Sequence, residues 1–311
     1  MRDADGERAA DGAVTGGRRA DPATEAFVAH RNLLFTVAYE MLGSAADAED
    51  VLQETWLRWA QVDLGGVRDQ RAYLIRVTTR QALTRLRSLG RRKESYVGSW
   101  LPEPLLTAPD VAEDVELADS VSMAMLLVME TLAPTERAVF VLREVFALGY
   151  DEIAEAVGKS HAAVRQIAHR ARAHVAARRP RGDASADAAR DVIEAFRRAS
   201  ETGDLQGLLD VLAPDVVLVG DGGGIKRAVL RPVVGSGKVA RLLAAGAARA
   251  GAGAAVRSTR VNGHPALAVW LDGALDTVLA AHVDDGLITG LYAVRNPEKL
   301  TRMRQETALI R

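Results

Sequence analysis

The chain has 311 residues, 48% of them hydrophobic, no cysteine, and a formal net charge of −1. The length predicts two or three domains, and the composition is that of a globular protein, not of a disordered or fibrous chain. Without cysteine there is no disulfide framework, thiolate nucleophile or cysteine zinc site. No apolar run approaches the roughly 18 residues of a membrane span, so we expect a soluble, cytoplasmic protein without membrane contact.

Charge is segregated along the chain although its sum is close to zero. Residues 68–93 contain nine Lys/Arg against one Asp, whereas residues 94–136 contain nine Asp/Glu and no Lys/Arg. Residues 159–181 contain seven Lys/Arg and no Asp/Glu. The two basic blocks are either solvated helix faces or nucleic-acid-binding surfaces. Residues 1–22 mix charges with Gly and Ala, and we expect a disordered tail there.

Residues 23–95 predict an all-helical domain. Apolar residues recur at helical spacing over 25–41, and residues 47–60 start with acidic side chains, which the helix dipole favours in a first turn. A third helix over 69–89 continues into the basic block. Four arginines lie within about 60° of arc on this helix and form a cationic stripe, defined as Arg76, Arg80, Arg87 and Arg91.

A second all-helical domain is predicted over 119–181, after a segment, 96–118, that we expect to be a solvated linker. Pro102, Pro104 and Pro109 forbid a continuous helix there, and acidic residues surround them. The second domain starts with a helix over 117–132 and a further helix after Pro134. It ends in a helix-turn-helix pattern, with Gly158 in the turn and Ser160 as the N-cap of the last helix.

The last of these helices carries a basic outward face. A recognition helix of this kind inserts its N-terminal residues into the major groove, where Arg165 suits the O6 and N7 acceptors of guanine. The competing interpretation is that Arg165 is an ordinary solvated residue. The predicted DNA-contacting residues are Ser160, His161, Arg165, Gln166, His169 and Arg172.

Residues 183–302 predict an α+β domain. Helices over 186–201 and 205–212 precede five candidate strands, at 216–219, 255–261, 266–271, 277–283 and 288–294. Asn262-Gly263 is a strong hairpin signal between two of the strands, and Asp285-Gly286 supplies another turn. The predicted fold is therefore multidomain, with two all-α domains followed by an α+β domain.

Three stretches resemble the extracytoplasmic-function (ECF) sigma factors of RNA polymerase: AEDVLQETWLRW, RAYLIRVTTRQALTRLRS and LAPTERAVFVLREVFALGYDEIAEAVGKSHAAVRQIAHRAR. The resemblance implies that residues 23–95 are sigma region 2, which binds the β′ coiled coil of core RNA polymerase and opens the minus-ten element. It implies that residues 119–181 are region 4, which reads the minus-thirty-five element.

By the same resemblance, Arg76, Arg80 and Arg87 lie where promoter-strand contacts are made, and a one-sided row of guanidinium groups suits strand phosphates. Core packing is the competing interpretation for Trp56 and Trp59. The residues that match the polymerase-binding helix are Asp47, Glu49, Asp50, Gln53, Glu54 and Trp56.

The C-terminal domain resembles the SnoaL-like cone domain that is fused behind region 4 in one ECF subgroup, where it is a built-in regulator that touches the linker. The turn at 221–224 follows a predicted strand, and its glycines allow the close backbone approach that docking of the WLPEP segment of the linker would need. The subgroup carries three short motifs, and this chain departs from two of them. Ile225 separates the DGGG motif from its lysine, and Glu298 in the NPEKL motif stands where Asp is common. The implied regulatory interface is WLPEP (Trp100, Leu101, Pro102, Glu103, Pro104), DGGG and a lysine (Asp221, Gly222, Gly223, Gly224, Lys226), and NPEKL (Asn296, Pro297, Lys299).

Other functions are weaker fits to the sequence. A cone domain can hold a catalytic or ligand-binding pocket, with Asp221, His264, His282 and Tyr292 as candidates, but no pair among them has a telling spacing. A helix-turn-helix regulator that acts without polymerase leaves the acidic helix and the cationic stripe unexplained. We expect no enzyme activity, metal or cofactor, with core RNA polymerase and promoter DNA as partners. A small ligand in the C-terminal domain stays an open alternative.

Overall fold

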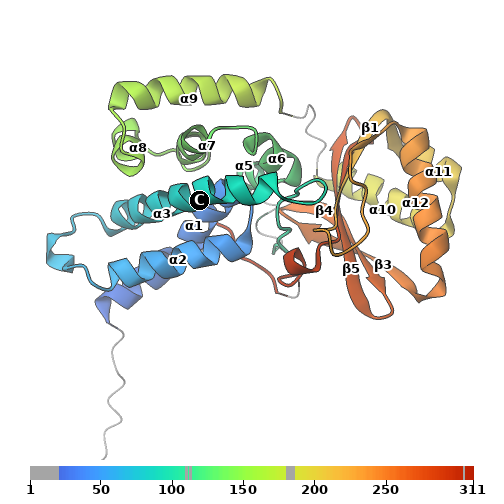
Figure 1. Ribbon diagram of the computed structural model, residues 1–311, viewed down its shortest axis with the longest axis horizontal. Coiled ribbons are helices and arrows are strands. Elements are labelled where there is room, and N and C mark those ends of the chain that lie inside the picture. The colour runs from blue at the N-terminus through green and yellow to red at the C-terminus, as the bar shows by residue number, and fades with distance from the viewer. Residues whose placement is uncertain (1–20, 109–110, 112–113, 180–185, 304) are drawn as a thin grey trace, which may run out of the picture.

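The computed structural model describes residues 21–108, 111, 114–179, 186–303 and 305–311. A helical half and an α+β half lie side by side, and helices from both predicted helical domains build the first half (Figure 1). Most of the predicted tail and Pro109 of the predicted linker lie outside the described residues.

The first helical domain contains α1 (Pro22–Leu42), α2 (Ala45–Trp59), a 3₁₀ turn (Leu64–Gly66) and α3 (Gln70–Glu94). Local chemistry sets the boundaries: Gly43 is left-handed (φ 67°) after α1, and the Ser44 hydroxyl accepts a hydrogen bond from Asp47 N at the start of α2. Trp59 is fully buried, and its indole N–H donates to Ala23 O at 2.7 Å. Core packing is therefore the role of Trp59 in this fold.

The second helical domain contains α5 (Val115–Val121), α6 (Met123–Met129), α7 (Pro134–Phe140), α8 (Tyr150–Val157) and α9 (His161–Ala176). A π-helical turn, Val141–Val145, extends α7. The predicted helix over 117–132 is wrong in one respect, because Ser122 has ψ 147° and separates α5 from α6. The predicted helix-turn-helix is confirmed: Gly158 is left-handed between α8 and α9, and Ser160 caps α9.

The C-terminal domain starts with α10 (Ala186–Thr202) and α11 (Leu205–Val211) and has a third helix, α12 (Ser236–Ala250). Its sheet has the order β2-β1-β6-β5-β4-β3, with β1 parallel to β6 and the other neighbours antiparallel. The strands are β1 (Leu212–Asp221), β2 (Val233–Val234), β3 (Ala254–Val261), β4 (His264–Leu271), β5 (Ala274–Asp284) and β6 (Leu287–Val294), followed by a 3₁₀ turn (Pro297–Lys299).

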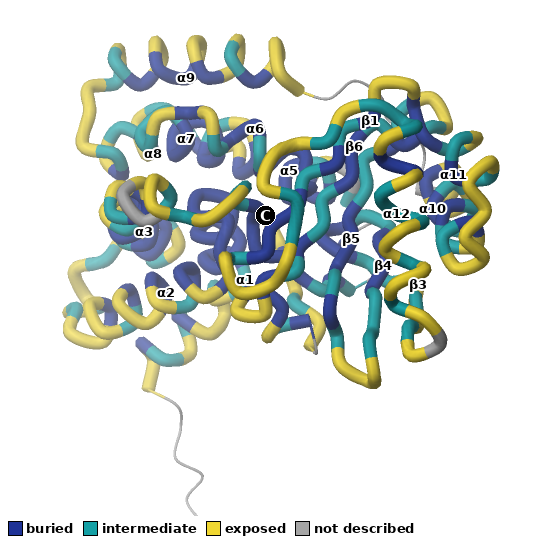
Figure 2. The backbone as a smooth tube through the Cα atoms, turned by 45° about the vertical axis from the view of Figure 1, so that its right-hand side comes forward, coloured by how far each residue is buried: buried dark blue, intermediate teal, exposed yellow. Residues whose placement is uncertain are grey.

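The β5 strand buries side chains on both of its faces, and much of it is dark blue or teal in Figure 2. Leu279 of β5 belongs to the core under α10 to α12 with Phe196, whereas its neighbours Val278 and Ala280 pack with Leu101 and Met123. Because successive side chains of a strand point to opposite faces, the second face of the sheet lies against the linker and α6.

Three features of this domain were not predicted, and the first is the short strand β2. The run SGKVARLLAAGAARA forms α12, and Asp272-Gly273 forms a third hairpin turn, between β4 and β5. Asn262-Gly263 and Asp285-Gly286 are confirmed as turns, since all three pairs have positive φ at both residues, as type I′ hairpin turns require.

The prediction of a solvated linker over 96–118 is wrong for most of the central part of this segment. Residues 101–105 and Thr107 are buried, and Leu101 and Leu105 are fully so. Proline prevented a helix there as expected, but an extended segment with apolar side chains can also be buried if its backbone groups find partners. The segment 101–107, here called the buried strap, runs between the two helical domains and the sheet.

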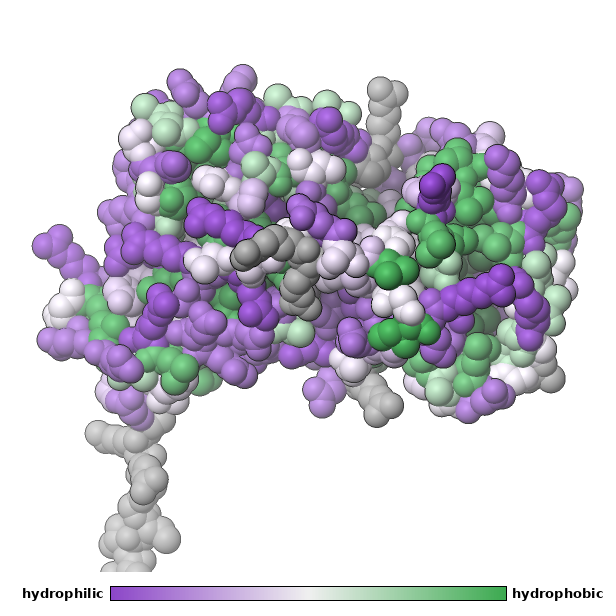
Figure 3. Space-filling model, viewed as in Figure 1, coloured by the Kyte–Doolittle hydropathy of each residue, from purple (hydrophilic) through white to green (hydrophobic). Residues whose placement is uncertain are grey.

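None of the described helices is long and apolar enough to cross a membrane. On the face shown in Figure 3, hydrophilic residues dominate the helical half, and apolar residues are more frequent over the α+β half.

Candidate nucleic-acid interface and interdomain junction

The outer face of α9 presents the predicted DNA-contacting residues to solvent. Arg165, Gln166, His169 and Arg172 are exposed. The opposite face of the helix is buried, with Val164, Ile167 and Ala171 in the helical core. Glu144 holds the Arg172 guanidinium at 2.7 Å. Ser160 N-caps the helix, and the His161 imidazole lies 3.6 Å from the Asp151 carboxylate.

The cationic stripe of α3 is divided by its contacts. Arg87 is exposed, whereas Arg76 forms an ion pair with Glu155 at 3.0 Å. The Arg80 guanidinium donates to Glu155 O at 2.8 Å and to Ala156 O at 3.4 Å, at the C-terminal end of α8. A helix C-terminus carries partial negative charge, so this end of α8 is a good site for guanidinium groups. The Arg91 side chain lies outside the described residues.

Several acidic residues of α2 are held by partners within the chain. Asp47 is buried and accepts from Arg85 Nε at 2.7 Å, and Arg85 also reaches Asp50 at 2.7 Å. Glu49 accepts two hydrogen bonds from Arg31, at 2.8 and 2.9 Å, and lies 3.4 Å from an Arg302 nitrogen.

The remaining predicted residues of α2 are more accessible. Gln53 and Glu54 are exposed on the outer face of the helix. Trp56 is half-buried, and its ring lies 5.3 Å from the ring of Phe27. The open face of α2 is therefore centred on Gln53 and Glu54, with Asp50 at its edge.

The buried strap is joined to the start of α2 through Glu103. The Glu103 carboxylate accepts hydrogen bonds from the backbone N–H groups of Ala45 and Ala46, at 2.8 and 3.2 Å, and lies 3.3 Å from the Ser44 hydroxyl. Glu103 N donates to Gly43 O at 2.8 Å, and the Tyr39 hydroxyl donates to Glu103 O at 2.6 Å. A carboxylate at this position stabilises α2 through its unpaired N–H groups and its dipole.

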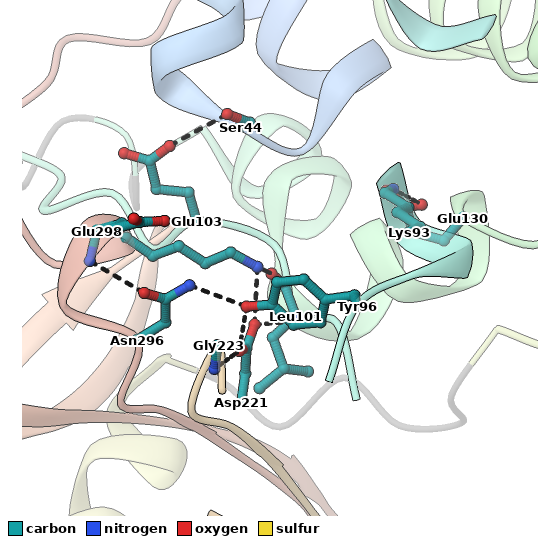
Figure 4. A network of polar contacts seen from close by, with 11 residues as sticks. Ser44, Lys93, Tyr96, Leu101, Glu103, Glu130, Asp221, Gly223, Asn296 and Glu298 are labelled. Atoms are coloured by element: carbon teal, nitrogen blue, oxygen red, sulfur yellow. Dashed lines mark hydrogen bonds and ion pairs between the residues drawn. The ribbon is translucent and has the colours of Figure 1, made fainter. Parts of the chain in front are cut away.

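The C-terminal domain holds the same strap at Leu101 (Figure 4). Leu101 N donates to Asp221 Oδ2 at 2.9 Å, and Lys299 Nζ donates to both Leu101 O (2.5 Å) and Asp221 Oδ2 (2.7 Å). The ammonium also lies 3.4 Å from the centre of the Trp100 ring, a cation–π contact. The structure thus brings one residue of each of the three predicted motifs to a single point.

Tyr96 and Asn296 extend this network. The Tyr96 hydroxyl donates to Asp221 Oδ1 at 2.6 Å and accepts from Asn296 Nδ2 at 2.9 Å. Burial raises the pKa of Tyr96, and its hydrogen bond to Asp221 raises it further. Burial lowers the pKa of Lys299, and the neighbouring Asp221 carboxylate partly offsets that effect.

The glycines of the DGGG turn are required by close approach. A Cβ at Gly222 would lie 2.0 Å from Lys226 O, and one at Gly223, where φ is 64°, would lie 2.4 Å from Asn296 Nδ2. Other residues of the predicted interface lie outside its buried part: Gly224 and Pro297 are exposed, and Lys226 forms a partly exposed ion pair with Asp276. Pro102 and Pro104 are buried in the strap.

Asn262 is a junction residue that the sequence did not single out beyond its turn. Its buried amide accepts from Leu105 N at 2.9 Å and donates to the Tyr39 hydroxyl and to Val121 O, both at 2.7 Å. One side chain therefore joins the strap, α1 and α5. The adjacent Gly263 could not carry a side chain, since a Cβ there would lie 2.7 Å from that of Ala118 in α5.

The two helical domains also share a buried polar contact. Glu40 of α1 is fully buried and accepts from the Ser120 hydroxyl of α5 at 2.8 Å, while its second oxygen has no hydrogen-bond partner among the described residues. The Arg137 guanidinium of α7 donates to Glu40 O at 3.0 Å. Burial raises the pKa of Glu40 to about 8, against the lowering effects of Ser120 and Arg137.

Comparison with known proteins identifies both helical domains. Residues 26–92 match the family model of Sigma-70 region 2, and residues 122–175 match that of Sigma-70 region 4. The chain is 38% identical to the ECF RNA polymerase sigma factor SigJ of Mycobacterium tuberculosis over 288 residues, which cover 88% of this chain and 92% of SigJ. This chain belongs to the ECF sigma factors.

Further relatives agree with this family over most of the chain. The probable ECF sigma factor SigI of Mycobacterium tuberculosis is 34% identical, with 92% of this chain and 97% of SigI covered. The crystal structure of Mycobacterium tuberculosis SigJ superposes with a TM-score of 0.73 at 36% identity, covering 90% of this chain and 98% of SigJ. The fold class of two helical sigma domains followed by a SnoaL-like α+β domain is thereby confirmed.

The family assigns the elements described above to sigma regions. The region 2 match covers most of α1–α3 and the region 4 match covers α6–α9, with the buried strap and α5 between the two matches. Asn262, Asp221 and Lys299 therefore belong to a C-terminal domain that contacts region 2 and the connection between the regions. Membership of this family indicates a non-enzymatic transcription factor.

The buried Glu40 carboxyl predicts a pH-dependent stability. Its pKa of about 8 in the folded chain exceeds the ordinary value of 4.5, so the folded state holds an extra proton between these values. The free energy of unfolding should therefore decrease as the pH rises through this range. Glu40→Gln should remove this dependence and be more stable than the wild type by about 1–3 kcal/mol at pH 9. Urea unfolding at pH 6 and pH 9 measures both, and parallel pH profiles would contradict the assignment.

Lys299→Met should destabilise the chain by about 3–5 kcal/mol, because it leaves the buried Asp221 carboxylate and Leu101 O without the ammonium. Lys226→Met is the matched control, since it removes a partly exposed lysine from the Asp276 ion pair and should cost at most about 1 kcal/mol. Urea unfolding of the two variants measures the difference. Equal losses would show that Lys299 does not hold the junction.

Proposed function

We propose that this chain binds core RNA polymerase and directs promoter recognition, and that its C-terminal domain controls this activity in cis by keeping regions 2 and 4 closed against each other. The observation that supports the proposal best is that Arg76 and Arg80, which we expect to bind the promoter strand, contact region 4 in the free chain. They belong to the predicted strand-binding stripe of region 2, yet in this structure they contact α8 of the region 4 helix-turn-helix.

A closed arrangement of this kind competes with DNA. The phosphates of an unpaired strand would bind the guanidinium groups of Arg76 and Arg80. In the closed chain these groups bind the Glu155 carboxylate and backbone carbonyl groups at the end of α8 instead. These contacts are partly exposed, so each contributes little to stability and can be exchanged. The buried contacts of the strap, Asn262 and Glu40, together with the apolar core that the two helical domains share, would then carry most of the free energy of closure.

Polymerase binding falls to the open face of α2, with Gln53 and Glu54 as its exposed centre. The proposal links this face to the C-terminal domain by two contacts: Arg302 reaches Glu49, and the strap places Glu103 at the start of α2. A partner that binds α2 and displaces Arg302 would therefore act on the C-terminal domain as well. Such coupling is reciprocal by thermodynamic necessity.

A catalytic or ligand-sensing cone domain is the second candidate function. Two of its four candidate residues already serve the junction, since Asp221 binds Leu101 and Lys299, and His264 Nε2 lies 3.0 Å from Ala118 O. Burial raises the pKa of Tyr292 to about 12, which makes it a poor general base at neutral pH. We therefore assign the domain a structural, regulatory role without chemistry of its own.

The direct test is transcription in vitro by core RNA polymerase and the full-length chain on a library of promoter fragments. We expect transcripts from a defined subset of promoters, with a shared sequence at the minus-ten and minus-thirty-five positions. Gln53→Ala/Glu54→Arg should weaken polymerase binding while promoter contacts stay intact. Failure of the wild-type chain to bind polymerase or to start any transcript would contradict the function.

Asn262→Ala tests control in cis. The substitution removes three buried hydrogen bonds at the junction, so we expect the closed state to lose about 1–3 kcal/mol and the free chain to bind its promoter DNA more tightly, by about 5- to 150-fold. Asp285→Ala is the matched control. Like Asn262, Asp285 is a left-handed residue in a two-residue hairpin turn, but both residues of its turn are exposed and not buried at the junction. Equal promoter affinities for wild type and Asn262→Ala would argue against closure by this turn.

A further inference from the structure

We propose that Tyr150 is a positioning residue for promoter recognition, which fixes Arg165 of the α9 reading face. The inference rests on the proposed function, because it assumes that α9 reads the minus-thirty-five element. It adds a residue of α8 that lies outside the predicted DNA-contacting set.

Two guanidinium groups lie over the ring of Tyr150. The Arg143 carbon is 4.7 Å from the ring centre, and the Arg165 carbon is 5.4 Å from it. The His161 ring meets it edge-on, with centres 5.8 Å apart and planes at 85°. Arg165 and His161 both belong to the first two turns of α9, where a recognition helix approaches base edges.

Arg143 and Tyr150 are anchored, whereas Arg165 is exposed. Arg143 extends α7 and donates from Nη1 to Leu148 O at 2.8 Å. Tyr150 starts α8 and is half-buried against the helical core, and Gly149 N donates to Glu152 at 2.9 Å to close that turn. The Arg165 side chain is exposed and lies over the same ring. The stack therefore restrains an otherwise flexible side chain from a rigid base.

Restraint of this kind bears on specificity. Two parallel hydrogen bonds to guanine require the guanidinium in one plane, and a free arginine side chain occupies many rotamers. Stacking on an aromatic face reduces that freedom before DNA arrives. Arg172, further along α9, is held differently: Glu144 accepts its hydrogen bond at 2.7 Å, and that bond is the main cause that raises the pKa of Arg172. Loss of the ring should thus affect Arg165 more than Arg172.

The test uses the full-length chain with core RNA polymerase on a promoter selected from a random library. Relative binding is measured for every single base-pair change in the minus-thirty-five element. Tyr150→Leu should reduce discrimination about two- to fivefold at the base pair that depends on Arg165 and leave other positions unchanged. Tyr150→Phe keeps the ring and should retain wild-type discrimination at that position.

Two further variants separate positioning from stability. In an Arg165→Ala background, Tyr150→Leu should cause no additional loss of discrimination, because the side chain that it positions is gone. Tyr73→Leu is the matched control, since Tyr73 stacks with Arg76 at 5.0 Å in region 2 and should leave the minus-thirty-five profile intact.

The outcomes distinguish this inference from the proposed function. If Arg165→Ala changes discrimination at no position, α9 is not used as proposed and the inference falls with it. If Arg165→Ala acts at one base pair but Tyr150→Leu does not, the proposed function stands and Tyr150 has no positioning role. A uniform loss at all positions, together with a lower unfolding temperature, would assign Tyr150 a merely structural role and overturn the inference.

Discussion

The arrangement of this sigma factor depends on the backbone of one buried, extended segment. Residues 101–107 contain two prolines and form no helix or regular strand, so their N–H and C=O groups must find partners elsewhere. Leu101 is satisfied by Asp221 and Lys299, Glu103 by region 2, and Leu105 by Asn262. The segment can stay buried only while region 2 and the C-terminal domain lie against it together.

This requirement makes the closed arrangement cooperative. Removal of the C-terminal domain would leave the backbone polar groups of Leu101 and Leu105 without their hydrogen-bond partners. It would also destabilise the start of α2, because Glu103 of the same strap binds the backbone there. The partly exposed contacts of Arg76 and Arg80 with α8 add a second, weaker connection between regions 2 and 4. A strong buried junction beside an exchangeable electrostatic contact is a suitable basis for a switch that polymerase and promoter DNA can shift.

Much of this structure could be predicted from local sequence. Local backbone preferences predicted most helices from their periodicity, the α8–α9 turn from its glycine, and the β3–β4 hairpin from its Asn-Gly pair. The burial of residues 101–107 could not be predicted, since proline and acidic residues are also typical of solvated segments. The role of Asn262 and the contacts of Arg80 with α8 depend on how separate domains meet. Periodicity within one domain does not contain that information.

In this arrangement regions 2 and 4 are closed against each other in the free chain and should separate on binding polymerase. The chain has no cysteine, so one cysteine introduced on the exposed face of α3 and one on that of α9 allow site-specific labelling. The distance between two such labels, measured by single-molecule energy transfer, should be short and narrowly distributed in the free chain and longer when core RNA polymerase is added. A broad distribution in the free chain, or the same distance with and without polymerase, would contradict the account.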